Sequence, residues 1–291
     1  MKNIHIPTID ELMTPDRAYG ILFGDEDGLK YLNLETKTTI TLRRMNLDIY
    51  AVFATKEKIF IGGSDTVIGP LFDKQEIQRI RANKINCIYE FNEGLLDAGG
   101  YGLFNTLEDK AVISEKEMNS KDVVCISSLA SDNQNNLYCL VQNKDSRHSF
   151  ARKDSLEQPI IRYNTRHTML CQAIIIPYGS LKGLDGKEYP FSVISCAHLQ
   201  CLDINGEKIK GTAVDSGQIK RIALLKQYGS TIEIAYSGIK LIDVTKATIN
   251  LDKKKVLQKE PILKDLHNGP LALHPVKNLS LHQKLIQGGR Q

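Results

Sequence analysis

Apolar residues occur along this chain in runs of strand length that are separated by short polar turns. In the segment KIFIGGSDTVIGPLFD, residues 58–73, an apolar run, a turn of small residues and a second apolar run lead to Asp73. Such runs of β-branched and aromatic residues, bounded by Gly, Ser and Asp, are typical of two strands joined by a tight turn. The segment therefore predicts a β-hairpin that ends at an acidic residue.

The same hairpin pattern recurs through most of the chain, at intervals of 36 to 49 residues. In most copies one more apolar run precedes the hairpin, as at 47–54, and another follows the acid, as at 38–42. Four short strands in a unit of about 40 residues are typical of a β-propeller blade. A ring of blades buries both faces of each sheet, which a single sheet cannot do. The closing acids are Glu35, Asp73, Asp109, Asp154, Asp203 and Asp243.

The repeats predict an all-β fold, a single β-propeller of four-stranded blades that spans residues 1–291. Six repeats are recognisable within about 18–252, and residues 253–291 are predicted to form a divergent last blade or a tail. We predict seven blades, because a seven-bladed ring would give about 42 residues to each blade. Six blades with a C-terminal appendage are the alternative, and a pair of β-sandwiches is the competing architecture.

The C-terminal segment decides how the ring closes. Its apolar runs are broken by Pro261, Pro270 and Pro275. Proline suits edge strands and turns, because it cannot donate a hydrogen bond to a neighbouring strand. In a seven-bladed ring we expect the strand-like segment 3–9, near the N-terminus, to help complete the last blade.

The step from an apolar residue to an acid at the end of the third strand resembles the tryptophan–aspartate step of WD-repeat propellers. Its best copies are Phe72-Asp73, Leu202-Asp203 and Ile242-Asp243. The resemblance covers residues 20–250 approximately and implies a propeller that serves as a scaffold for protein interactions. The chain contains no Trp, and no repeat carries the Gly-His dipeptide that opens a typical WD repeat. The Asp, His, Ser and Trp network of that family is therefore not carried over.

The composition and the N-terminal segment indicate the class of protein and its cellular compartment. Apolar residues make up 42% of the chain and charged residues 25%, which is ordinary for a globular protein with a core. No apolar run approaches the ~18 residues of a membrane span. Pro7, Asp10 and Glu11 interrupt the segment where a signal peptide needs an apolar core. We therefore expect reduced cysteines and a cytoplasmic protein without membrane contact, with the nucleus as the other compartment.

The sequence predicts no catalytic residue, cofactor or metal site. Cys196, His198 and Cys201 are zinc ligands by type, but on a strand the first two point to one face and Cys201 to the other. The Gly-rich segments lack the Lys of a phosphate loop, and there is no GxSxG nucleophile motif. If the chain were an enzyme, the first candidates for catalytic residues would be the histidines in or near turns, which are His148, His167 and His198.

The connections between successive units are repeatedly basic. In a propeller these connections emerge on one face and surround the central channel, so four of the five would place positive charge there. Arginine presents a planar fork of donors that suits carboxylates and phosphates. The net charge of +4 is modest, so its location matters more than its sum. The predicted partner-binding residues are Arg43, Arg44, Arg79, Arg81, Lys84, Arg162, Arg166, His167, Lys220 and Arg221.

These observations predict a non-enzymatic protein-interaction platform. We expect it to bind an acidic or phosphorylated protein partner through the basic ring of loops, as a subunit of a larger assembly. One alternative is an RNA-binding propeller that uses the same face, although the chain shows no base-stacking motif. The other alternative is a propeller hydrolase or lyase with its site in the central channel.

Overall fold

The computed structural model describes most of the chain. Its described part consists of β-strands with two α-helices and one short 3-10 helix. The described residues are 17–25, 28–45, 48–56, 58–63, 66–70, 78–81, 84–166, 172–198, 201–211, 219–238, 243–264 and 272–288.

In this part of the chain, antiparallel pairing joins the strands into six four-stranded sheets. Five sheets are blades of strands that follow one another along the chain. They contain β4 (Ala51–Ala54), β5 (Lys58–Gly62), β6 (Thr66–Pro70) and β7 (Gln78–Arg81); β8 (Ile85–Phe91), β9 (Gly94–Gly99), β10 (Gly102–Asn105) and β11 (Lys110–Ser114); β12 (Val123–Ser131), β13 (Leu137–Asn143), β14 (Arg147–Arg152) and β15 (Ile161–Arg166); β16 (Ala173–Ile176), β19 (Ser192–His198), β20 (Cys201–Ile204) and β21 (Glu207–Lys208); and β22 (Ile219–Tyr228), β23 (Thr231–Gly238), β24 (Val244–Asn250) and β25 (Lys255–Leu263).

The remaining four-stranded sheet joins the two ends of the chain. It contains β26 (Leu273–Val276), β1 (Gly20–Asp25), β2 (Gly28–Asn33) and β3 (Thr39–Arg44), in that order. A small hairpin, β17 (Leu181–Lys182) with β18 (Glu188–Tyr189), is inserted between β16 and β19. The helical segments are α2 (Glu115–Ser120), η1 (Lys153–Ser155) and α3 (Leu279–Gly288).

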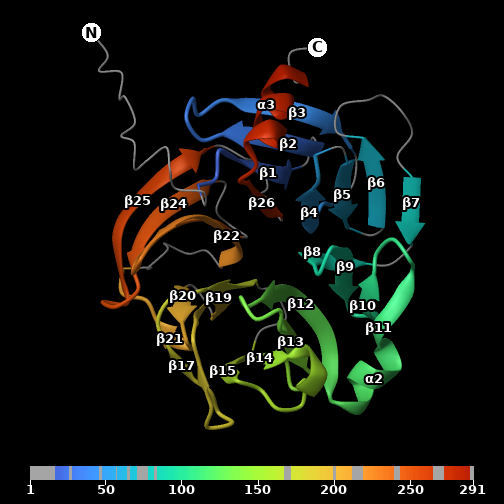
Figure 1. Cartoon of the computed structure of the whole chain (residues 1–291), viewed down its shortest axis with the longest axis vertical. Coiled ribbons are helices and arrows are strands. Elements are labelled where there is room, and N and C mark those ends of the chain that lie inside the picture. The colour runs from blue at the N-terminus through green and yellow to red at the C-terminus, as the bar shows by residue number, and fades with distance from the viewer. Residues whose placement is uncertain are drawn as a thin grey trace.

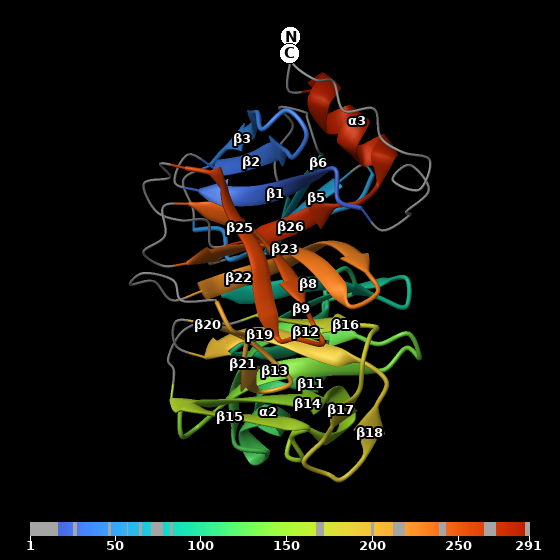
Figure 2. The same ribbon diagram turned by 90° about the vertical axis from the view of Figure 1, so that its left-hand side faces the viewer.

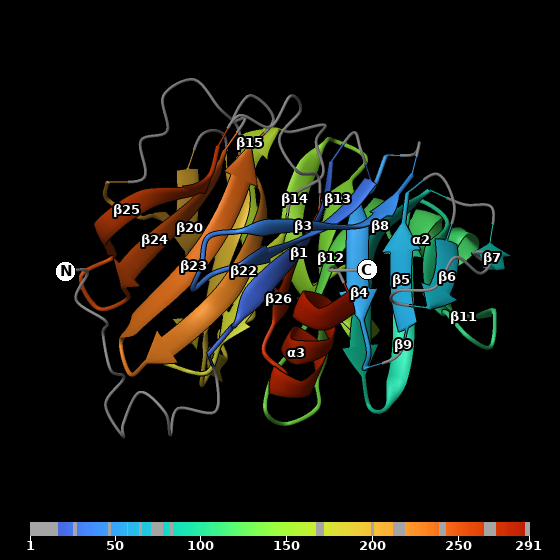
Figure 3. The ribbon, with the colours of Figure 1, turned by 90° about the horizontal axis from the view of Figure 1, so that it is seen from above.

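The sheets are arranged around a common centre, and each turns one edge strand toward it (Figure 1). These inner strands are β26, β4, β8, β12, β16 and β22, and all of them contribute residues to a central cavity. Figures 2 and 3 show the same sheets from the side and from above, with α3 beside the sheet that contains β1, β2 and β3. The predicted all-β propeller with blades of four antiparallel strands is confirmed.

The predicted number of blades is wrong. Seven blades require the C-terminal segment to build a blade of its own, but β26 pairs with β1, with Gly20 opposite Val276. The C-terminal segment therefore completes the first sheet and is not an appendage to a six-bladed ring either. Instead, five blades form from consecutive strands, and the two ends of the chain share one more four-stranded sheet. The segment 3–9 lies outside the described residues.

Two prolines of the C-terminal segment lie in edge strands, as expected. Pro261 is in β25, the outer edge of its sheet, and Pro275 is in β26, an inner edge that faces the channel. An edge strand pairs on one side only, so a residue without an N–H group is tolerated there. Pro270 lies outside the described residues.

The acids that anchor the sequence repeat mark the end of the third strand in several sheets. Glu35, Asp109 and Asp154 follow β2, β10 and β14, and Asp203 lies in β20. Asp243 departs from this pattern because it precedes β24, and Asp73 lies outside the described residues. The Asp203 carboxylate accepts a hydrogen bond from the Ser195 hydroxyl at 3.3 Å, and its burial raises the pKa of this acid well above the usual range.

Neighbouring sheets pack face to face through apolar side chains. Between the sheet of β12 to β15 and the sheet that begins with β16, Tyr138 of β13 stacks on Phe150 of β14 with ring centroids 5.5 Å apart and meets Phe191, which precedes β19, edge-on at 5.3 Å. All three rings are buried, and such aromatic pairs contribute about 0.5–1.5 kcal/mol beyond the burial of their area. This packing holds adjacent sheets at a set angle and thereby positions the inner strands around the channel.

The closing sheet is covered by α3, which gives a test of the closure. Leu285 of α3 is completely buried against residues that include Leu22 and Leu29, whereas Leu279 of the same helix is 49% exposed. We expect Leu285→Ala to lower the free energy of unfolding by about 2–5 kcal/mol, because it leaves a cavity in a packed core. Leu279→Ala is the matched control and should change it by less than about 0.5 kcal/mol. Chemical denaturation of both variants measures the difference, and equal effects would contradict the docking of α3.

Candidate functional site: the central channel

A cavity of about 390 Å³ lies at the centre of the propeller, where the inner strands converge. Its size is near the lower end of the range for small-molecule pockets, about 300–1,000 Å³. Each inner strand is the edge of its sheet nearest the centre, so residues along it border the cavity. The channel lining is therefore set by one short segment from every sheet.

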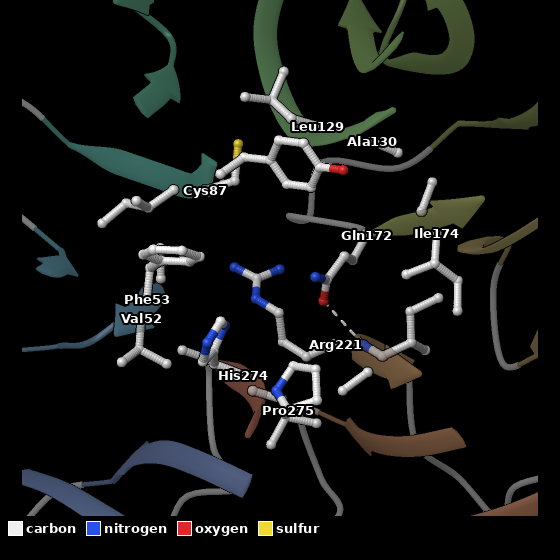
Figure 4. Close-up of a pocket in the computed structure, with 18 of the residues that line it drawn as sticks. Val52, Phe53, Cys87, Leu129, Ala130, Gln172, Ile174, Arg221, His274 and Pro275 are labelled. Atoms are coloured by element: carbon white, nitrogen blue, oxygen red, sulfur yellow. Dashed lines mark hydrogen bonds between the residues drawn. The ribbon is translucent and has the colours of Figure 1, made fainter. Parts of the chain in front are cut away.

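The channel walls are mainly apolar. Figure 4 shows Val52, Phe53, Leu129 and Ile174 on different sides of the cavity, contributed by β4, β12 and β16. Phe53 and Ile174 are only partly buried, although they lie in the middle of the fold. Apolar side chains that are left partly uncovered in a central cavity form a surface that an apolar ligand can bury.

Arg221 places a positive charge in this apolar channel. It lies in β22, is 4% exposed, and its Nη2 atom donates a hydrogen bond to the Tyr50 carbonyl oxygen at 3.1 Å. Figure 4 shows its guanidinium group directed toward the middle of the cavity, between Phe53 and Gln172. Burial of a charge is costly unless hydrogen bonds or an opposite charge compensate it. A cation kept at this position is therefore a candidate recognition group for an anion.

Two amide side chains lie at the same end of the channel as Arg221. The Gln172 Oε1 atom accepts a hydrogen bond from the backbone N–H of Ile222, the residue after Arg221, at 3.0 Å. Asn86, which is 5% exposed, donates from Nδ2 to the Cys125 Sγ atom at 2.8 Å and to the Ile126 carbonyl oxygen at 3.3 Å. We call Tyr50, Asn86, Gln172 and Arg221 the polar end of the channel.

Lys84 adds a second cation near the polar end. It is exposed, precedes β8, and its Nζ atom lies 5.0 Å from the centroid of the Tyr50 ring. The charges of Lys84 and Arg221 both lower the pKa of the Cys125 thiol, although burial has the larger effect and raises it to about 11. Both cations therefore act on the same region, around Tyr50 and Cys125.

Two other titratable groups of the channel, the His274 imidazole and the Cys87 thiol, are neutral at neutral pH. His274 of β26 meets the Phe53 ring edge-on at 4.9 Å, and burial lowers its pKa to about 4. Burial raises the pKa of the Cys87 thiol well above its usual range. A thiol in that state is a poor nucleophile, and a neutral imidazole adds no charge. The positive charge of the polar end therefore comes from Arg221 and Lys84.

The structure separates the predicted partner-binding residues into two groups. Arg221 and Lys84 meet around Tyr50 at the polar end, and Lys220 precedes Arg221 in β22. The other described members lie in the outermost strands of their sheets and not in loops around the channel, because the strands extend further than the sequence pattern indicated. They are Arg43 and Arg44 of β3, Arg79 and Arg81 of β7, and Arg162 and Arg166 of β15. His167 lies outside the described residues.

The sequence interpretation did not single out Asn86, Gln172 or His274. Each is a polar residue in or beside a short apolar strand, in KINCIYEF, MLCQAIII and LALHPV. A polar residue that interrupts the innermost strand of a blade is the signal that could have identified them. That signal becomes readable only once the innermost strands are known.

Two of the histidines considered for catalysis, His148 and His198, lie among the described residues, whereas His167 does not. His148 is buried in β14 and does not line the cavity, and His198 ends β19. Among the residues that the structure describes, no three His, Cys, Asp or Glu side chains are grouped to hold a metal ion. In the same part of the chain, no helix is long and apolar enough to cross a membrane.

Comparison with known proteins supports the fold alone. No protein-family model matches the chain, and no curated protein matches it. A protein of unknown function from Bacteroides caccae is similar over 90% of this chain and 100% of its own, with 10% identity and a TM-score of 0.51. A second protein of unknown function, from Bacteroides thetaiotaomicron VPI-5482, is similar over 88% of this chain and 68% of its own, with 10% identity and a TM-score of 0.51.

A third structure, hydrazine synthase of Kuenenia stuttgartiensis, is matched over 77% of this chain and 52% of that chain, at 11% identity. Its TM-score of 0.33 is too low to support an argument about fold or function. The function must therefore be inferred from the residues of this chain.

The low pKa of His274 predicts acid sensitivity. Between pH 6.5 and about 4, the unfolded chain binds a proton at this imidazole and the folded chain does not, so stability falls as the pH falls. We expect a loss on the order of 3 kcal/mol from this group. His274→Phe keeps a ring beside Phe53 and should remove that part of the loss. Denaturation curves from pH 7 to pH 4 measure it, and parallel profiles for the two proteins would contradict the prediction.

Proposed function

We propose that this propeller is a non-enzymatic interaction platform that binds an acidic partner at the polar end of its central channel. The observation that carries the proposal is the Arg221 guanidinium, 4% exposed within an otherwise mainly apolar cavity. An arginine in such a site presents a planar set of donors that matches a carboxylate or a phosphate. Lys84, exposed nearby, would attract the same anion as it approaches.

The charge balance of the lining supports an anionic ligand. Among the described lining residues, the basic side chains are Arg221 and Lys277, and the acidic side chain is Glu90. Glu90 lies near the end of β8, whereas Asn86 of the polar end lies at its beginning. The Glu90 carboxylate therefore lies toward the other end of β8 from the polar end.

The proposal narrows the predicted basic surface to its members near the channel. Arg43 and Arg44 belong to the same predicted set, but they lie in β3, at the opposite edge of the closing sheet from its inner strand. They carry the same kind of charge at a different place. They are therefore suitable control positions for a test of the channel.

Affinity capture from native cell lysate tests the proposal. We expect the Lys84→Gln/Arg221→Gln variant to lose a protein that both the wild type and the Arg43→Gln/Arg44→Gln control retain, with affinity at least about tenfold weaker. Each protein is tested with and without nuclease and phosphatase, and circular dichroism verifies that the variants fold. Loss of the captured protein after phosphatase would identify the acidic group as a phosphate.

Three results would contradict the proposal. Equal capture by all three proteins would show that the channel cations do not bind the partner. Loss from the control alone would place the interface on the outer strands. Loss of the captured material after nuclease would favour the RNA-binding alternative, whose affinity should fall steeply with salt.

A further inference from the structure

The chemistry of the polar end can be resolved further, because its amide groups are oriented by hydrogen bonds. Of the two terminal atoms of the Gln172 amide, only the oxygen can accept a hydrogen bond from the Ile222 backbone N–H, so the position of Oε1 is assigned without ambiguity. Its Nε2 atom then lies on the opposite side of the amide, on the side of the Arg221 guanidinium in Figure 4. Nε2 makes no hydrogen bond to any residue that the structure describes. The polar end thus offers an amide N–H₂ donor beside a guanidinium.

Asn86 contributes an acceptor to the same region. Its Nδ2 atom is fixed by Cys125 and the Ile126 carbonyl oxygen, which leaves Oδ1 buried and without a hydrogen-bond partner among the described residues. A buried acceptor without a donor is unfavourable, because it has lost its hydrogen bonds to water. A ligand that brought an N–H group to Asn86 would remove this penalty. Asn86 and Arg221 line the same cavity, and each lies near the beginning of an inner strand.

The rest of the cavity is suited to an apolar group of a ligand. Phe53, Leu129 and Ile174 line it with apolar side chains. The volume of about 390 Å³ is small for a folded segment and suits one or two residues of an extended chain, or a small molecule. The ligand should therefore carry its anionic group and its apolar group close together.

We infer that the channel takes a carboxylate attached directly to an apolar body and flanked by an amide N–H, as in the C-terminal apolar residue of a polypeptide. This inference rests on the proposed function and specifies the acidic group that Arg221 recognises. In this arrangement the Arg221 guanidinium and the Gln172 Nε2 atom donate to the carboxylate oxygens. The amide N–H donates to Asn86 Oδ1, and the apolar side chain packs against Phe53 and Ile174. The same chemistry occurs in a free N-acylated apolar amino acid.

Isothermal titration calorimetry of the full chain with four probes distinguishes a polypeptide C-terminus from a free N-acylated amino acid as the ligand. They are an acetylated Gly-Ser-Gly-Leu peptide with a free carboxylate, the same peptide as a C-terminal amide, N-acetyl-leucine, and an amidated Gly-Asp-Gly peptide whose acid is a side chain. We expect the free-acid peptide to bind, and its amide to bind at least about tenfold more weakly, because a hydrogen-bonded charge is lost. Equal binding of N-acetyl-leucine would identify a small carboxylate as the source, and tighter binding of the peptide would identify a chain terminus.

Variants of the protein test the assigned contacts. Arg221→Lys keeps the charge and loses the planar fork, and Gln172→Ala removes the second donor. Each variant should bind the free-acid peptide about tenfold or more weakly than the wild type does, and its affinity for the amidated peptide should be unchanged. Arg152→Gln is the control, because Arg152 lies in β14 and bonds to Asn136, away from the channel. Thermal melts of all variants establish that they fold. Should Arg221→Lys fail to fold, Gln172→Ala alone decides the test.

Equal binding of the free-acid and amidated peptides would overturn the inference. Binding of the Gly-Asp-Gly peptide alone, lost in Arg221→Lys, would also overturn it and would leave the proposed function intact. If no acidic probe bound to the wild type, both the inference and the proposed function would fail.

Discussion

Antiparallel hydrogen bonds between β26 and β1 join Leu273–Val276 to Gly20–Phe23, and this pairing of the two chain ends closes the propeller. Without β26 the sheet of β1, β2 and β3 would lack its inner strand, and β1 would present an unpaired edge to the channel. Closure also gives the channel its last wall, since His274 and Pro275 come from β26. The helix α3 then covers the same sheet with Leu281 and Leu285. The fold and the cavity therefore depend on one four-residue strand.

The channel that results combines an apolar wall with a small set of polar groups at one end. Desolvation keeps His274 and the thiols Cys87 and Cys125 uncharged, so it suppresses acid–base and nucleophilic chemistry at neutral pH. It cannot neutralise Arg221, because a guanidinium stays protonated in proteins. The same burial that neutralises His274 and the two thiols therefore leaves the positive charge of Arg221 in place at the polar end of the cavity.

Much of the fold could be predicted from the sequence because each strand and turn is decided locally. The Asn205-Gly206 pair, for example, joins β20 to β21 with positive φ angles of 53° and 79°, which the residue types favour. The acids Glu35, Asp109 and Asp154 marked the ends of third strands correctly. The number of blades could not be predicted, because it depends on the strand with which β26 pairs. The local sequence pattern of β26 would be the same in a separate last blade as in its observed pairing with β1.

The sequence by itself determined an all-β propeller of four-stranded units, since alternating apolar residues and turn residues act over a few positions. It also marked Lys84 and Arg221 as basic residues between units. Only the tertiary structure decided that Arg221 lies inside the channel, whereas Arg43 lies in an outermost strand, because both occupy similar places in the linear pattern. It likewise decided that Asn86, Gln172 and Arg221 form one polar end. These residues are far apart in the chain, and only the closed ring brings the beginnings of their strands together.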